Sequence, residues 1–241
     1  MKKISILLAS AVLVACGQSQ VADEKTVAAA TEQTPAEIDT LAIVLDAQSD
    51  ELKARYAYRH PQETLEFVGI EPGMTVVEGL PGGGWYSKIL VPYLGADGHL
   101  IGADYSLEMY PNFNFVNEEF MANQQQWTTN FPAGAREWGG DNGARVSAFH
   151  MGSMPEEFAG TADVVFFPRV LHNLARFESQ GGYLTAALAD AYAVLKPGGT
   201  LGIVQHEARA DTSDEFANGS RGYLKKDFVI EVVEAAGFEF V

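Results

Sequence analysis

The sequence predicts an α/β fold in which a mostly parallel sheet is flanked by helices on both faces. Short β-rich runs alternate with helical stretches through most of the chain, which is typical of such a sheet. A glycine-rich turn joins the first of these runs to the helical stretch that follows it. The chain has 241 residues, of which 47% are hydrophobic and 20% charged, so it can bury one sizeable core. We therefore expect a single domain at residues 41–241.

The predicted elements follow one another in alternating order. β-rich runs predict strands at residues 75–78, 99–104, 145–149, 163–167 and 200–205. Apolar residues at three- and four-residue spacing predict helices at residues 86–94, about 116–129, 182–195 and 226–236. We expect the last helix to turn Phe228, Val232 and Val233 inward and to end at Gly237.

The charge of the chain bears on its partners. The formal net charge is −16 at pH 7. A protein that binds nucleic acid needs a basic surface for the phosphate backbone, and a surface this acidic repels polyanions. We therefore expect a small-molecule substrate and no nucleic-acid partner.

The N-terminal residues predict export and lipid attachment. Lys2 and Lys3 precede an apolar run at residues 4–15, which is too short to span a bilayer and is typical of a signal peptide. The run ends in Leu-Val-Ala followed by Cys16 and Gly17, which resembles the lipobox of bacterial lipoproteins. This resemblance implies a signal peptide at 1–15 and an acylated Cys16 (a palmitate-type anchor) on a flexible tether at 16–40. It also implies a location in the cell envelope, facing the periplasm, and Gly17 favours the outer membrane. An ordinary signal peptide with an incidental cysteine is the alternative.

A glycine-rich loop follows the first predicted strand. Glu78 closes that strand, and Gly82 and Gly84 leave bare backbone before the next helix, whose first N–H groups are unpaired. Asp104 closes the second strand, where nucleotide-binding folds place a carboxylate that accepts both ribose hydroxyls. A tight turn between strand and helix would explain the glycines alone, but not this combination with two acids.

Together with Lys-Pro-Gly-Gly at residues 196–199, these residues resemble class I S-adenosylmethionine (SAM) methyltransferases over residues 50–241, in particular a bacterial branch with Pro-Gly-Gly-Gly-Trp-Tyr after the first strand. The resemblance implies a Rossmann-like fold, SAM as cofactor, and methyl transfer to a small molecule. It also implies an incomplete C-terminal strand hairpin here. Leu80 and Pro81 depart from the usual loop pattern. The resemblance implies that the cofactor is bound by Glu78, Gly82, Gly83, Gly84, Asp104 and Ser153.

Three histidines follow predicted strand ends, where open α/β sheets bind ligands: His150, His172 and His206. Histidine can accept a proton near neutral pH, and methyl transfer needs no metal, so we expect none. We favour His172 as the catalytic base, with Arg169 beside it holding an anionic substrate or the methionine carboxylate. For each histidine, a loop hydrogen bond is an equally good explanation.

The sequence leaves several alternative interpretations open. Arg59 and His60 either form a lid over the cofactor or lead a turn. The aromatic residues at 110–115, with Trp127 and Trp138, either line a substrate pocket or pack over the sheet. The glycine loop, with Ser87 as a third small residue, also nearly fits a nicotinamide dehydrogenase. Because SAM is made in the cytoplasm and the predicted lipoprotein is exported, a non-catalytic ligand-binding lipoprotein with this fold is the alternative function.

Overall fold

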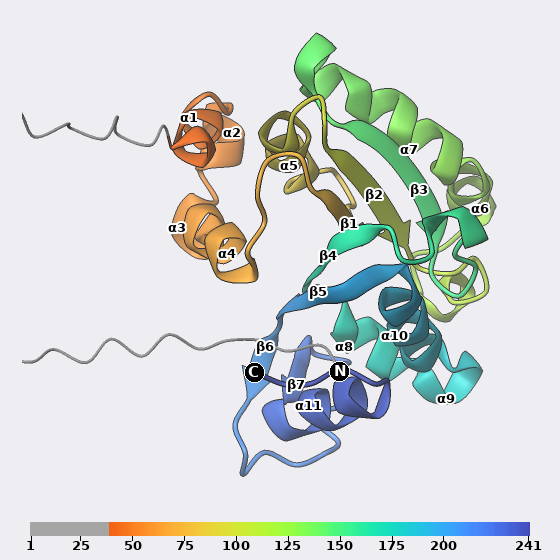
Figure 1. Ribbon diagram of the computed structural model, residues 1–241. Helices are drawn as coiled ribbons and strands as arrows, with labels where there is room; N and C mark the ends of the chain where they lie inside the picture. Colours follow the sequence, from red (N-terminus) through yellow and green to blue (C-terminus); the bar gives the residue numbers. More distant parts are fainter. Residues whose placement is uncertain (1–38) are drawn as a thin grey trace, which may run out of the picture.

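A computed structural model describes residues 39–241. Cys16, the predicted signal peptide and most of the predicted tether lie outside the described residues. At the centre is a five-stranded sheet in the order β3-β2-β1-β4-β5, and every neighbouring pair in it is parallel (Figure 1). Its strands are β1 (Thr75–Gly79), β2 (His99–Asp104), β3 (Arg145–His150), β4 (Ala162–Pro168) and β5 (Leu195–Val204). The predicted mostly parallel α/β fold is confirmed.

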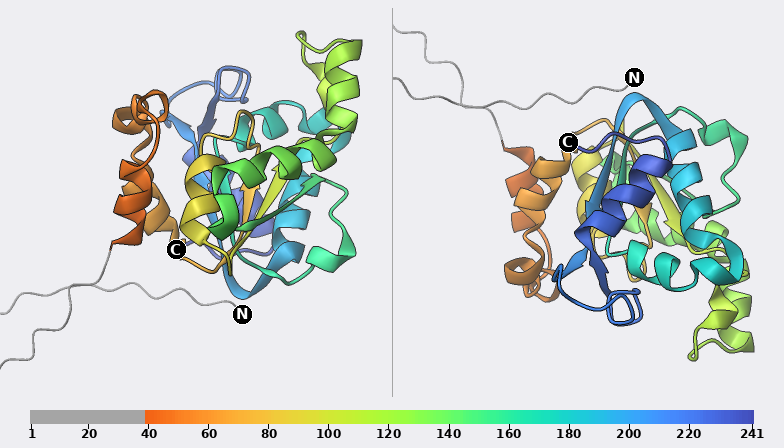
Figure 2. Two further views of the ribbon diagram at one scale, coloured as in Figure 1. Left: turned by 90° about the horizontal axis from the view of Figure 1, so that it is seen from above. Right: turned by 90° about the horizontal axis from the view of Figure 1, so that it is seen from below.

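Helices cover both faces of this sheet, and Figure 2 shows the resulting layers from above and below. On one face lie α1 (Thr40–Asp46), α2 (Asp50–Lys53), α4 (Pro61–Val68), α5 (Ser87–Leu94) and α7 (Trp127–Ala135). The other face is covered by α8 (Leu171–Arg176), α10 (Tyr183–Val194) and α11 (Lys226–Ala235). The remaining helices are α3 (Tyr56–Arg59), α6 (Glu118–Gln125) and α9 (Glu178–Gly181).

The two-residue period of the strands divides the core into two clusters. Val76 of β1 packs with the α1, α4, α5 and α7 side, whereas its neighbour Val77 packs with the α8 and α10 side. Val164 and Val165 of β4 divide in the same way. Successive strand side chains point to opposite faces, and β1, β2 and β4 are buried on both, so these three strands are apolar at most positions.

The single helix predicted at about 116–129 is in fact two helices, α6 and α7, separated at Gln126. The second of them continues to Ala135 through Pro132, a residue that lowers helix stability. Tertiary packing explains the extension. Phe131 is buried over Gly102, where an added Cβ would lie 2.7 Å from the phenyl ring.

The C-terminal part differs from the sequence prediction at two points. A small parallel pair, β6 (His206–Ala208) and β7 (Tyr223–Lys225), follows β5 and was not predicted. The prediction that Phe228 points inward is wrong, because this side chain is 36% exposed. Helix α11 instead packs through Val229, Val232, Val233 and Ala236, a stripe at helical spacing that leaves Phe228 at its margin. No helix among residues 39–241 is long and apolar enough to cross a bilayer.

Candidate functional site

The strand order reverses between β1 and β4, and we use the word crevice for the region beyond the carboxyl ends of these two strands. From β1 the chain proceeds to β2 and β3 on one side, whereas β4 and β5 lie on the other. In open α/β sheets, ligands bind at the carboxyl ends of the strands where the order reverses in this way. Glu78, Asp104, Arg169 and the loop at residues 80–84 all lie at or just beyond these strand ends.

Glu78 lies near the end of β1 and is almost completely buried, with 1% of its surface exposed. Its Oε2 accepts a 2.6 Å hydrogen bond from the hydroxyl of Ser87, the first residue of α5. Burial raises the pKa of Glu78 to about 7, although Ser87 and the nearby Arg59 oppose the rise. Near neutral pH this carboxyl group is therefore poised to ionise when a cation approaches it.

Asp104 ends the neighbouring strand β2 and is 3% exposed. Its Oδ1 accepts two hydrogen bonds, from the backbone N–H of Tyr105 at 2.8 Å and from the hydroxyl of Tyr110 at 2.7 Å. Burial raises the pKa of Asp104, while these two donors and His150 lower it. Within residues 39–241 no hydrogen bond to Oδ2 is found, so this oxygen can accept one from a ligand.

The glycine loop combines an open part with a packed part. No atom lies within 4 Å of a Cβ built on Gly83, and near Gly82 only the Leu80 carbonyl oxygen does, at 3.9 Å. A Cβ on Gly84 would lie 2.4 Å from the Trp138 indole. Bare backbone is thus open to a ligand at 82 and 83, whereas packing against Trp138 already explains the glycine at 84. The predicted ligand contact at Gly84 stays a prediction.

A cavity of about 200 Å³ lies beyond the ends of β2 and β3. It is lined by Ser106, two residues after Asp104, by Ser153, three residues after β3, and by Tyr183 of α10. The Asp104 carbonyl oxygen accepts a 2.8 Å hydrogen bond from the N–H of Met151, which also lines the cavity. The predicted residue Ser153 therefore lies beside a space that is large enough for a planar ring, on the Asp104 side of the crevice.

Arg169 follows β4 directly and has a left-handed backbone, with φ +62°. Its N–H donates a 2.7 Å hydrogen bond to the Val204 carbonyl oxygen of β5. His172 lies three residues further on, in the first turn of α8, and its Nδ1 is buried without a hydrogen-bond partner. Burial lowers the pKa of His172. The Gln205 side chain opposes this shift, whereas the positive charge of Arg169 lowers the pKa further. The ring is therefore neutral at pH 7 and can accept a proton.

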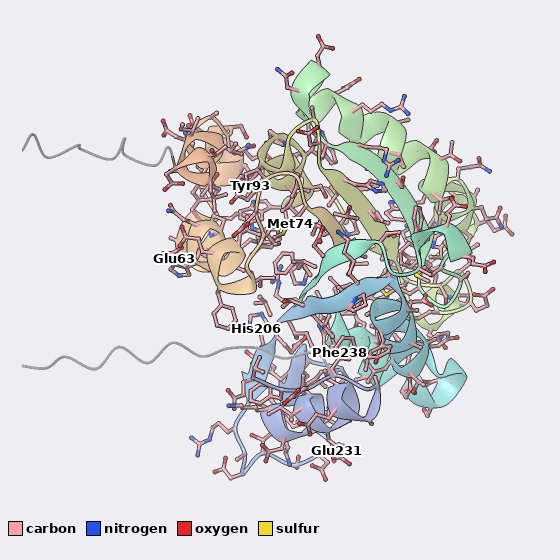
Figure 3. The ribbon with its side chains drawn as sticks, in the orientation of Figure 1. Glu63, Met74, Tyr93, His206, Glu231 and Phe238 are labelled. Carbon is pink, nitrogen blue, oxygen red and sulfur yellow. The ribbon has the colours of Figure 1, made fainter. Side chains whose placement is uncertain are left out.

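The three histidines do not form one cluster. His172 and His206 lie close enough for each to feel the charge of the other, on the side of β4 and β5. In Figure 3, His206 lies where β5 leads into β6, with α3 and α4 above it. His150 ends β3, three strands away from β4, or about 14 Å at the usual strand spacing. Its Nδ1 is 2.9 Å from the Tyr105 carbonyl oxygen, so it belongs to the surroundings of Asp104.

Sequence reasoning missed three residues of the site. Tyr110 had been grouped with possible pocket aromatics, but it is buried and bonds Asp104. Trp138 covers Gly84 from 54 positions further along the chain, which no local pattern signals. Ser87 bonds Glu78, and the position of a hydroxyl in the first helical turn after the strand was the available signal. Trp127 stacks on Phe131, so it packs over the sheet.

His60 forms the turn between α3 and α4 and is exposed. Arg59 lies closer to the crevice, because its guanidinium stacks 4.4 Å from the ring centre of Trp85. Among residues 39–241, no group of three or more His, Cys, Asp or Glu side chains is arranged to hold a metal ion.

No protein-family model and no curated protein matches the sequence. Solved structures do resemble it. A SAM-dependent methyltransferase from Aquifex aeolicus aligns with 83% of this chain and 88% of its own, at 18% identity and a TM-score of 0.51. An arsenic(III) SAM methyltransferase from Chlamydomonas reinhardtii aligns with 82% of this chain and 61% of its own, at 17% identity and a TM-score of 0.45. At such identities a structural likeness shows the fold alone. The likeness to the Aquifex aeolicus structure shows that the described domain has the Rossmann-like fold of class I methyltransferases.

Proposed function

We propose that this protein is a SAM-dependent methyltransferase that acts on a small molecule. The observation that carries the proposal is the placement of two buried carboxyl groups, Glu78 and Asp104, at the ends of adjacent parallel strands, with open glycine backbone at 82 and 83 between strand and helix. Few folded proteins bury carboxyl groups without a partner charge, and neither group has an ion pair among the described residues.

The residues present fit the cofactor. Asp104 has one oxygen held by Tyr105 and Tyr110 and a second oxygen free to accept a ribose hydroxyl. The cavity beside Ser153 suits the adenine ring. Glu78 suits the methionine ammonium group, which would favour its ionised form. Once bound, SAM would supply a sulfonium methyl group, to whose carbon a lone pair of the acceptor would form a bond while the C–S bond breaks and its electrons stay on sulfur.

The role of the chain is then to orient the acceptor, exclude water and receive a proton. His172 is the base in this proposal, because its ring is neutral and its Nδ1 is buried without a partner.

The proposal includes an anchor at Cys16, which would hold the domain at the cell envelope facing the periplasm. The N-terminal sequence supports this part. Replacing Cys16→Ser in the full chain should move the protein from the membrane fraction to the soluble fraction. Equal membrane recovery of both forms, together with no acyl mass on Cys16, would contradict the anchor.

Binding of the cofactor is the first test. Calorimetry on the purified mature protein should show micromolar affinity for SAM and for S-adenosylhomocysteine, and Asp104→Ala should abolish both. A folded wild-type protein that binds neither compound would contradict the enzyme proposal. That result would favour the alternative, a ligand-binding lipoprotein with this fold, to which export away from the cytoplasmic SAM supply also points.

A further inference from the structure

A group of basic side chains lies at the crevice of this acidic protein. Arg59 lies in α3, Arg169 directly after β4, His172 in α8 and His206 in β6, in a chain whose formal net charge is −16. Burial lowers the pKa of Arg59, and the positive charge of Arg169 lowers it further. Arg169 and His206 lower the pKa of His172 in the same way. The guanidinium groups of Arg59 and Arg169 repel each other, and this repulsion costs free energy that an anion bound between them would offset.

Tyr86 connects the two arginines physically. The Arg59 guanidinium lies 5.6 Å from the Tyr86 ring centre, and the Tyr86 hydroxyl donates to the Arg59 carbonyl oxygen at 3.4 Å. The same ring packs 4.9 Å from Phe166 of β4, three residues before Arg169. Arg59, from α3, and Arg169, directly after β4, thus both lie near Tyr86.

Neither guanidinium is neutralised by a carboxylate. The described ion pairs join other residues, and no side-chain hydrogen bond of Arg169 is found within 39–241. The Nε of Arg59 is buried without a partner. The nearest acid, Glu78, is bonded to Ser87 and is largely protonated below pH 7. Unpaired buried donors of this kind suit an oxyanion, which guanidinium groups bind with two parallel hydrogen bonds.

The backbone of Arg169 supports a binding role. A left-handed conformation costs a non-glycine residue on the order of 1 kcal/mol or more, and such strain persists mainly at functional sites. It is held here by the short hydrogen bond to Val204. The charge of Arg169 lowers the pKa of both His172 and Arg59, so its side chain lies near these two groups.

The strand order separates the group expected to bind the methyl donor from the basic groups. Asp104 ends β2, whereas Arg169, His172 and His206 follow β4 and β5, so β1 lies between them; the cavity is lined by Ser106 and Ser153 and also by Leu174 of α8. We infer that Arg59 and Arg169 bind the carboxylate or phosphate of the methyl acceptor, so that the acceptor is an anionic small molecule. This inference rests on the proposed methyltransferase function.

Titration with inorganic phosphate tests it, at constant ionic strength and with S-adenosylhomocysteine saturating. We expect saturable binding to the mature wild-type protein, weakened about 10- to 100-fold in Arg59→Gln and in Arg169→Gln. Arg169→Lys should recover only part of the loss, because lysine lacks the guanidinium fork. Arg136→Gln makes the same charge change at an exposed site and should bind as the wild type does. Equal phosphate affinity in all variants would overturn the inference.

A second arm identifies which ligand the arginines serve. S-Adenosylhomocysteine carries a carboxylate that 5′-methylthioadenosine lacks, so both are titrated into each folded variant. Unchanged affinity for both supports an acceptor site. A tenfold loss for S-adenosylhomocysteine alone would place the arginines on the cofactor carboxylate and overturn the inference. If the wild type binds neither nucleoside but still binds phosphate through the arginines, the methyltransferase proposal fails, and with it the assignment to an acceptor.

Discussion

The hydroxyl of Ser87 donates a 2.6 Å hydrogen bond to the carboxyl group of Glu78 inside the protein, where both residues are almost fully buried. This bond joins the end of β1 to the first turn of α5 and so fixes the two sides of the glycine loop. A single hydrogen bond does not offset the burial of a negative charge, and the pKa of Glu78 therefore rises to about 7.

Glu78 should make the protein less stable as the pH rises. Its folded pKa lies above its unfolded value, so its contribution is fully present below about pH 4.5 and is lost through about pH 7. The loss should be on the order of 2–3 kcal/mol. Urea unfolding at pH 5 and pH 8 measures it. Glu78→Gln should remove this pH dependence and be the more stable form at pH 8. Glu63→Gln, at an exposed position, should follow the wild type. Parallel pH profiles for Glu78→Gln and the wild type would contradict this role of Glu78.

Cofactor binding should release protons near pH 7. An ammonium group beside Glu78 favours its ionised form, and a group with a pKa of about 7 then gives up about half a proton. Calorimetry with S-adenosylhomocysteine in buffers of different ionisation enthalpy measures this release. 5′-Methylthioadenosine has no ammonium group and serves as the control. The same heat in every buffer for S-adenosylhomocysteine would show that its ammonium group does not approach Glu78.

Gly84→Ala should destabilise the protein far more than Gly83→Ala. Gly84 has φ +75° and is covered by Trp138, so a methyl group there meets both backbone strain and a steric clash. We expect a loss of about 2–4 kcal/mol in the free energy of unfolding. Gly83 has open space above it and should lose no more than about 1 kcal/mol. Similar losses at the two positions would mean that Trp138 does not cover the loop in solution.

His99 should cause stability to fall as the pH drops. Burial, with the charge of Arg145, lowers its pKa to about 4. The Arg145 guanidinium lies 2.9 Å from His99 Nδ1, and Nε2 lies 2.9 Å from the Ser147 hydroxyl, an arrangement that suits a neutral ring. Its contribution is present above about pH 6.5 and is lost as the pH falls towards 4, by about 1–2 kcal/mol after solvent screening is allowed for. His99→Gln should abolish this loss in urea unfolding, and an unchanged acid profile would refute the assignment.

The centre of the sheet was predictable because β1, β2 and β4 are buried on both faces. Apolar runs marked these three strands, β3 and β5 were marked by β-rich residues with fewer apolar positions, and both acids were correctly expected at strand ends because each follows an apolar run. The three-residue strands β6 and β7 are too short for any periodicity to reveal. Val232 and Val233 of α11 were correctly expected to face inward, and only Phe228 was misplaced, since Phe228 and Val229 fit the helical spacing equally well.

The site was only partly predictable for a different reason. Its chemistry depends on contacts between distant positions, such as Trp138 on Gly84 and Tyr110 on Asp104. Residue types near the strand ends suggested three converging histidines. The strand order instead separates His150 from His172, and that order is a property of the assembled sheet.

A crystal structure with S-adenosylhomocysteine tests the central claim most directly. We predict ribose hydroxyls within about 3 Å of the Asp104 carboxyl group and the ligand backbone against Gly82 and Gly83. Ligand density at another place, or ribose hydroxyls that face away from Asp104, would contradict it.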